Sequence, residues 1–89
     1  GYSWLGLEGA LDRANAAALA ERLKARLEEG RQTLVLNLER LEQADRLALA
    51  ELAKALRRYR SRVRVVVPSD GELAACLAAL ARIFEPLTA

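Results

Sequence analysis

Two aspartates are the residues of this sequence best placed to do chemistry. Asp12 and Asp45 each follow an apolar stretch, and each precedes a segment with helical spacing. A pair of carboxylates at one end of a sheet can act as general acid and general base. Two helix caps account for the same residues without any reaction, because an aspartate side chain accepts hydrogen bonds from the first free backbone N–H groups of a helix. We favour the caps.

The other side chains that catalysis or cofactor binding would require are scarce. The sequence contains no histidine and one cysteine, so imidazole chemistry is absent and a metal site would depend on scattered carboxylates. Gly6 and Gly9 are too sparse to form a glycine-rich phosphate loop. The residues therefore predict a protein that is not an enzyme, with no cofactor and no metal site.

The single cysteine also bears on the cellular compartment. Cys76 cannot form an internal disulfide, and its place in an apolar helical segment predicts a small buried side chain. No apolar run approaches the ~20 residues of a membrane helix. We therefore expect a cytoplasmic protein that does not insert directly into a membrane.

Five arginines form the one local basic cluster. They suit either an anionic partner or a solvated helix end at which cations compensate the helix dipole, and we favour the second interpretation. A net charge of +2 and the lack of flanking aromatic side chains in depth do not indicate nucleic acid binding. The cluster consists of Arg57, Arg58, Arg60, Arg62 and Arg64.

The elements that position these side chains are organised around residues 34–56. Leu34–Leu38 is a short apolar run typical of a buried strand, and Arg46–Arg60 has the spacing of an amphipathic helix. A loop over residues 39–45 joins them, with Asp45 as the N-cap of the helix. Because ligands of open α/β sheets bind where strand ends meet helix starts, function is sought first at Gln43–Leu47.

The remaining segments repeat the alternation of strand and helix. Predicted strands cover residues 2–8, 33–38 and 62–67, and residues 9–12 form a turn or a short second strand, with a bulge at Gly9. A helix runs from Asp12 or Asn15 to about Glu29, with Gly30 in the left-handed conformation at its end.

The last predicted helix follows the third long strand. Ser69 and Glu72 have the spacing of a capping box, in which each side chain bonds the backbone N–H of the other residue. The helix then presents an apolar face made of Leu73, Cys76, Leu77 and Leu80. Burial of a large apolar side chain is worth roughly 1.5–3 kcal/mol, so the end of the chain should pack back on the body. Its apolar residues are Ile83, Phe84 and Leu87.

One face of the predicted sheet has no helix to cover it. Right-handed crossovers place consecutive helices on one face, and the alternation along the strands sends Tyr2, Trp4, Val35 and Val66 to the other. A solvated face would normally carry Thr, Lys or Glu at these positions. A second copy, a helix of a neighbouring domain or the chain's own tail can cover it, and we predict self-association, as a homodimer, through this face.

Four stretches of the sequence follow one another in a recognisable order and at a recognisable spacing. They are Leu7-Glu8-Gly9-Ala10-Leu11-Asp12, Leu34-Val35-Leu36-Asn37-Leu38, Val65-Val66-Val67-Pro68-Ser69 and Ala79-Leu80-Ala81-Arg82-Ile83-Phe84. In this order they resemble the STAS domain, the module of bacterial anti-sigma-factor antagonists and of sulfate-transporter tails. The resemblance covers nearly the whole chain. It implies a single α/β domain over residues 1–89, with an about four-stranded mixed sheet and three main helices largely on one face.

The resemblance also locates a regulatory position and shows that it is degenerate. Asp45-Arg46-Leu47-Ala48-Leu49 matches the family segment Asp-Ser-Ser/Thr-Gly-Leu, whose second hydroxyl residue is phosphorylated by a partner kinase in anti-sigma antagonists. Leu47 occupies that position and has no hydroxyl group. A leucine carries none of the charge of a phosphate, roughly −1.5 to −2, so it does not imitate the modified state either.

The family implies a protein-interaction surface at this helix start. Leu47 can point into the core or offer an exposed side chain to a partner, and both alternatives stay open. Three kinds of partner follow from the resemblance: an anti-sigma factor or related kinase, the ATPase of an ABC-type lipid or anion transporter, or further copies of the chain in a larger assembly. The predicted partner-binding residues are Asp12, Asn15, Gln43, Ala44, Asp45, Arg46, Leu47, Ala48 and Ser69.

Overall fold

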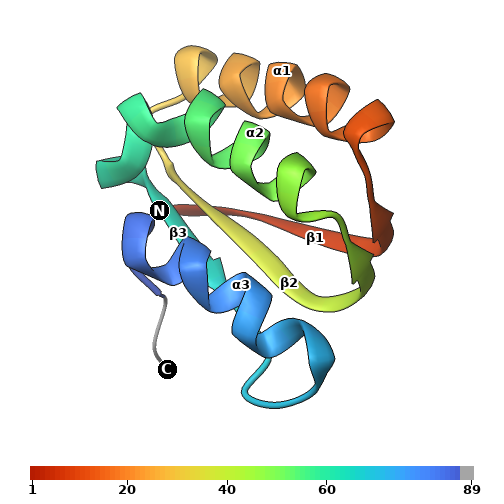
Figure 1. Ribbon diagram of the computed structural model, residues 1–89. Helices are drawn as coiled ribbons and strands as arrows, with labels where there is room; N and C mark the ends of the chain where they lie inside the picture. The colour runs from red at the N-terminus through yellow and green to blue at the C-terminus, as the bar shows by residue number, and fades with distance from the viewer. Residues whose placement is uncertain (87–89) are drawn as a thin grey trace.

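Three parallel strands in the order β1-β2-β3 form the sheet of the computed structural model, which describes residues 1–86. Strand and helix alternate along the chain, as the sequence predicts (Figure 1). The strands are β1 (Tyr2–Leu11), β2 (Thr33–Ala44) and β3 (Val63–Val66). The helices are α1 (Arg13–Glu29), α2 (Arg46–Leu56) and α3 (Glu72–Ile83), and the 3-10 segment η1 (Arg57–Arg62) follows α2.

The prediction of an about four-stranded mixed sheet is wrong, because no fourth strand is seen within residues 1–86. The residues considered for a short second strand, Gly9–Leu11, instead continue β1. A shift in the β1–β2 register between Gly9 and Ala10, with Gly9 at φ +76°, absorbs the irregularity without ending the strand. The irregularity therefore lies beside Gly9, where a bulge was predicted, but the additional residue, Glu42, belongs to β2. All pairings within the sheet are parallel.

All three helices lie on the same side of the sheet (Figure 1). Right-handed crossovers between neighbouring parallel strands require this arrangement for α1 and α2. Between helices and sheet lies one apolar core, in which leucines spaced four residues apart on the helices meet alternate residues of the strands. Its fully buried large side chains include Leu23, Leu27, Leu36, Leu38, Leu52, Leu56, Leu77 and Phe84.

β2 is longer than its apolar run indicates. Residues 39–44 were expected to form a loop, yet they extend the strand and pair with the second half of β1, from Glu8↔Arg40 to Leu11↔Ala44. Most of these side chains are exposed, so the segment has no apolar run to reveal it. An ion pair between Arg40 and Glu8, at 3.3 Å, joins the two strands on the surface.

The C-terminal ends of α1 and α2 differ from their predictions. The helix expected to reach Arg60 ends at Leu56 and tightens into η1, where Tyr59 leaves helical geometry at φ −103° and ψ 15°. Gly30 caps α1 with φ −110° rather than a left-handed angle. The side chain of Arg62 donates to the carbonyl of Gly30 at 2.5 Å and so ties η1 to the end of α1.

The predicted capping box of α3 does not form. The N-cap is Gly71, at φ +99°, and no side chain accepts a hydrogen bond there, so Ser69 lies outside the helix. The apolar tail packs back on the body as predicted at Phe84, which is 1% exposed; Leu87 lies outside the described residues. Pro86 forms a parallel bridge with Val65, and Arg64 pairs with Glu85 at 3.5 Å, so residues 85–86 lie along the outer side of β3.

The sheet face opposite the helices carries the apolar residues that the alternation predicts. The register aligns Trp4, Val35 and Arg64 across the three strands. Tyr2 and Trp4 are more than half exposed, Val66 is half-buried and Val35 is completely buried between its two longer neighbours. Within the described residues, no helix is long and apolar enough to cross a membrane.

Candidate functional site

Asp12 and Asn15 form a closed set of hydrogen bonds at the start of α1. The Asp12 carboxylate accepts from the Asn15 N–H at 2.9 Å, and the Asn15 side-chain oxygen accepts from the Asp12 N–H at 3.0 Å. The Asn15 amide also donates to the Ala10 carbonyl at 2.9 Å. Three bonds therefore fix the end of β1 against the first turn of α1, although both side chains are exposed to solvent.

Asp45 has the same role at the start of α2. Its carboxylate accepts from the Leu47 N–H at 2.7 Å, and its carbonyl accepts from the Leu49 N–H at 3.0 Å. Its own N–H donates to the Leu11 carbonyl at 2.9 Å, which brings the carboxyl ends of β1 and β2 together. Both aspartates are thus N-caps as predicted, and each carboxylate is engaged with a helix backbone.

Leu47 is exposed rather than buried in the core. It keeps 58% of its surface accessible, the largest exposed fraction among the exposed large hydrophobic side chains of the described residues. Gln43, Asp45 and Arg46 are also exposed, and Ala44 is half-buried. Ala48 is completely buried, so its side chain faces the core and offers nothing to a partner. We refer to Gln43–Leu47 as the α2 tip.

The predicted site residues lie along one edge of the sheet but do not all meet. Hydrogen bonding between Leu11 and Asp45 places Asp12 and Asn15 beside the α2 tip, and the exposed ion pair of Arg13 with Glu51, at 3.7 Å, links α1 to α2 nearby. Ser69 is exposed in the connection after β3, at the same carboxyl edge. Within residues 1–86, no hydrogen bond or ion pair joins Ser69 to the tip.

The described side chains at this edge combine capping carboxylates with exposed apolar surface. Both aspartates are bound to backbone N–H groups, and the exposed Leu47 lies two residues beyond Asp45. Across residues 1–86, no group of three or more metal-ligating side chains comes together. An exposed leucine on the first turn of a helix is apolar surface that gains free energy when another molecule covers it.

Sequence reasoning missed a second feature, which begins at the α2 tip and extends along the helix. Ala50 of α2 and Ala79 of α3 line a groove between the two helices, and Cys76, predicted to be buried, lines it as a half-buried residue. The available signal was a set of alanines at helical spacing on the outer sides of both helices. Such alanines usually indicate only helix propensity, so the sequence does not distinguish a groove from a plain helical surface.

The comparison with family models gives one match. A model described as "Mlab, STAS domain" matches residues 3–85 of the chain. No curated protein sequence matches the chain. The match extends from β1 through α3, so it includes the α2 tip and both capping aspartates.

Proposed function

The chain belongs to the STAS domain family, and from this premise we propose that it is a non-catalytic, regulatory protein-interaction module that docks its partner through the α2 tip. The observation that carries the proposal is the exposure of Leu47, at 58%, on a helix start fixed by Asp45. A large apolar side chain at this exposure gains free energy only when another molecule covers it.

The absence of a hydroxyl group at Leu47 determines the kind of regulation. A phosphate on this first turn would face the positive end of the α2 dipole and would add charge at the point of contact. Leucine excludes that modification. We propose that the partner complex forms by shape and apolar contact, without the phosphorylation switch that the family segment otherwise supports.

The identity of the partner separates the remaining alternatives. An anti-sigma factor or related kinase is the first candidate, and the ATPase of an ABC-type lipid or anion transporter is the second. The exposed Leu47 and the missing hydroxyl suit a constitutive subunit of such a transporter, because a permanent complex needs no switch. An oligomerisation domain within a larger bacterial protein is the third candidate.

The test compares binding with stability for Leu47→Asp. Affinity capture followed by mass spectrometry identifies the partner as an anti-sigma kinase, an ABC ATPase or the chain itself, and calorimetry measures its affinity for each variant. We expect Leu47→Asp to weaken binding by at least about tenfold, since an aspartate leaves a charge in a desolvated contact. Stability should change little, because an aspartate in the first turn of a helix favours the dipole by about 0.3–1 kcal/mol.

Ala17→Asp is the matched control, because it adds the same charge at an exposed position of α1. It should leave both the affinity and the melting temperature near those of the unmodified chain. A Leu47→Asp protein with unchanged affinity and a much lower melting temperature would show that Leu47 is a core residue and would overturn the proposal. Phosphate detected on the isolated protein by mass spectrometry would contradict the missing switch.

A further inference from the structure

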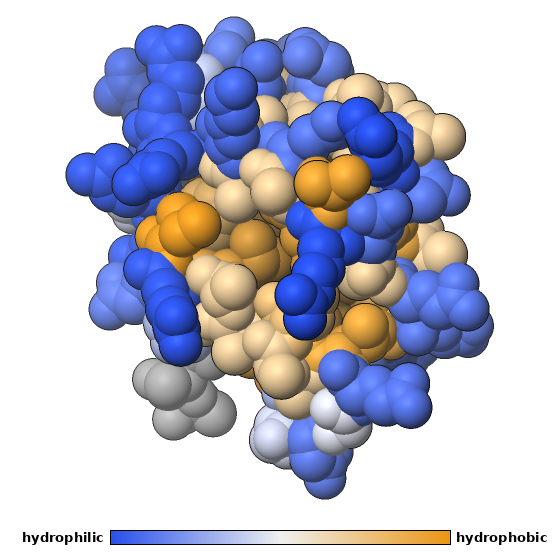
Figure 2. Space-filling view, in the orientation of Figure 1, coloured by the Kyte–Doolittle hydropathy of each residue, from blue (hydrophilic) through white to orange (hydrophobic). Residues whose placement is uncertain are grey.

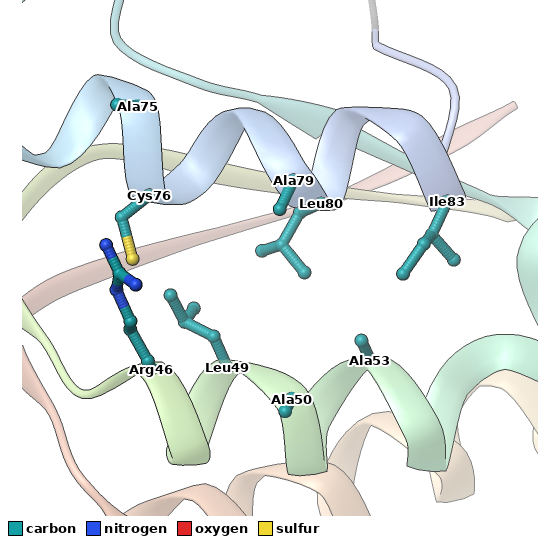
Figure 3. A pocket seen from close by; sticks show the side chains of 9 residues that line it. All are labelled: Arg46, Leu49, Ala50, Ala53, Ala75, Cys76, Ala79, Leu80 and Ile83. Carbon is teal, nitrogen blue, oxygen red and sulfur yellow. The ribbon is translucent and has the colours of Figure 1, made fainter.

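A groove of about 420 Å³ runs between α2 and α3 (Figure 3). Leu49, Leu80 and Ile83 supply its branched apolar side chains. Figure 2 shows apolar surface across the middle of the helix-covered face, where these two helices lie. Within residues 1–86 nothing fills the groove, although its lining is mostly apolar. A mostly apolar hollow on the surface is a feature of binding sites.

Small side chains along both edges of this groove leave room for another helix to pack into it. Ala50 and Ala53 border it on α2, and Ala75 and Ala79 border it on α3. Because alanine side chains are short, another helix can come close to both α2 and α3 and place larger apolar side chains between them. α2 has 11 residues and α3 has 12. At 1.5 Å per residue the groove can follow about three turns of a docked helix, or about 17 Å.

Cations without an ion-pair partner lie at both ends of the groove, although α3 also carries Glu72 in its first turn. Arg46, in the first turn of α2, lies beside Cys76 at one end of the groove (Figure 3). Lys54 in the last turn of α2 and Arg82 in the last turn of α3 are exposed towards the other end. None of the three has a carboxylate within ion-pair distance among residues 1–86, whereas Glu51 is paired with Arg13 on the α1 side.

We infer that the groove docks an amphipathic α-helix of the protein partner, with its apolar face on the alanines and acidic side chains at both ends. The inference rests on the proposed function, and it extends the contact from Leu47 along the whole of α2. The partner helix supplies the carboxylates that Arg46 and the far end of the groove lack. Its apolar side chains cover Leu49, Leu80 and Ile83.

Two other occupants fit less well. A small molecule would be covered poorly, because the groove is open along its length between two surface helices. A second copy that offered its own α2 or α3 would bring Arg46, Lys54 or Arg82 against the same cations, and like charges in a contact oppose binding. An acidic amphipathic helix satisfies both the shape and the charge.

Synthetic peptides test the inference without knowledge of the partner. Two helical peptides of about 14 residues carry the same leucine stripe, one with glutamates at both ends and one with lysines. Fluorescence anisotropy measures their affinity, and the rate of Cys76 alkylation by N-ethylmaleimide reports occupation of the groove. We expect the glutamate peptide to bind at least about tenfold more tightly than the lysine peptide, because its charges complement the groove ends. It should also slow the alkylation.

Substitution of Arg46 supplies the control. Arg46→Glu should narrow or reverse the preference between the two peptides, whereas Arg22→Glu on the exposed surface of α1 should leave it unchanged. Equal binding of both peptides, or binding that leaves the alkylation rate unaltered, would overturn the inference. Protection of Cys76 that rises with protein concentration in the absence of peptide would also overturn it, because a second copy would then be the occupant.

A further pair of variants separates this inference from the proposed function. Ala79→Trp and Ala50→Trp each fill the groove from one side at an exposed position, so the fold should tolerate them. Once the partner is identified, both variants should weaken its binding. If both bind as the unmodified chain does while Leu47→Asp does not, the groove inference fails and the role of the tip stands.

Discussion

At the start of α2, a single carboxylate fixes the first turn, which carries an exposed apolar side chain. Asp45 holds the Leu47 N–H at 2.7 Å, and in this turn Leu47 is directed outward while Ala48 turns inward. The sequence predicted the cap from residue type and spacing alone, because the preference for aspartate at this position is local. It left Leu47 open between core and surface, because the direction of a first-turn side chain depends on how the helix rests on the sheet.

Tyr59 joins η1 to α1 through a hydrogen bond that depends on its proton. Its hydroxyl donates to the Glu28 carboxylate at 2.7 Å. This bond, with partial burial and the charge of Glu28, raises the pKa of Tyr59 above its ordinary value of 10.0, while Arg58 and Lys24 oppose the shift. A raised folded-state pKa means that the stabilisation is fully present below the unfolded value and is lost as the pH rises through the folded value.

We therefore expect alkaline pH to destabilise the unmodified chain more than Tyr59→Phe. Melting temperatures measured from neutral pH to above pH 10 should fall more steeply for the unmodified chain, because only it loses the Tyr59 proton and gains repulsion from Glu28. Glu28→Gln removes the carboxylate and should return the tyrosinate titration of Tyr59 towards its usual range. Tyr2→Phe provides the background, since Tyr59 is then the remaining tyrosine. Parallel pH profiles for the unmodified chain and Tyr59→Phe would contradict the expectation.

Among the elements, those with an apolar period were predictable and those without it were not. β1, α1 and the first half of β2 follow directly from alternation or helical spacing, and β3 differs from its prediction only at its ends. Residues 39–44 were missed because this half of β2 pairs with β1 alone and most of its side chains are in solvent. The prediction of a capping box at α3 was wrong because Gly71, rather than Ser69, is the N-cap of the helix.

Gly71 offers a test at this scale. Its φ of +99° and ψ of 175° lie in a region essentially restricted to glycine, so Gly71→Ala should destabilise the fold by about 1–3 kcal/mol. Gly6→Ala is the control, because Gly6 has a negative φ and open space where the new methyl group would lie. Urea unfolding curves should give a lower midpoint for Gly71→Ala than for Gly6→Ala. Equal midpoints would show that the turn before α3 rearranges at no cost.

In the whole molecule, the two faces of the sheet are unequal. The helices cover one face, whereas the other presents Tyr2 at 54% and Trp4 at 56% exposure beside the half-buried Val66. Parallel sheets usually have both faces covered. The sequence predicted this imbalance from the alternation of Val35 and Val66, and it also predicted the carboxyl edge as the place of the candidate site. Its alanines did not distinguish the α2–α3 groove from a plain helical surface, because a groove is a property of two helices together.

We expect the open face to mediate self-association. Sedimentation velocity at increasing concentration should show a growing dimer fraction for the unmodified chain, and Trp4→Lys should shift the equilibrium towards the monomer, because it places a charge in the contact. Trp4 fluorescence should change as the dimer forms. Ala17→Lys, at an exposed position of α1 on the helix-covered side, serves as the control, because it adds a positive charge away from Trp4. A protein that stays monomeric at high concentration, with Trp4 fluorescence typical of a solvent-exposed tryptophan, would contradict this expectation.

The bridge between Pro86 and Val65 has a consequence for aggregation. It occupies the outer flank of β3, so within residues 1–86 the long free flank of the sheet is that of β1. A molecule with one unpaired edge strand can pair with the same edge of a second molecule. Neither molecule then has an unpaired edge to bind a third. Growth by strand addition therefore stops at a dimer. A continuous fibre would first require residues 85–86 to dissociate from the edge of β3.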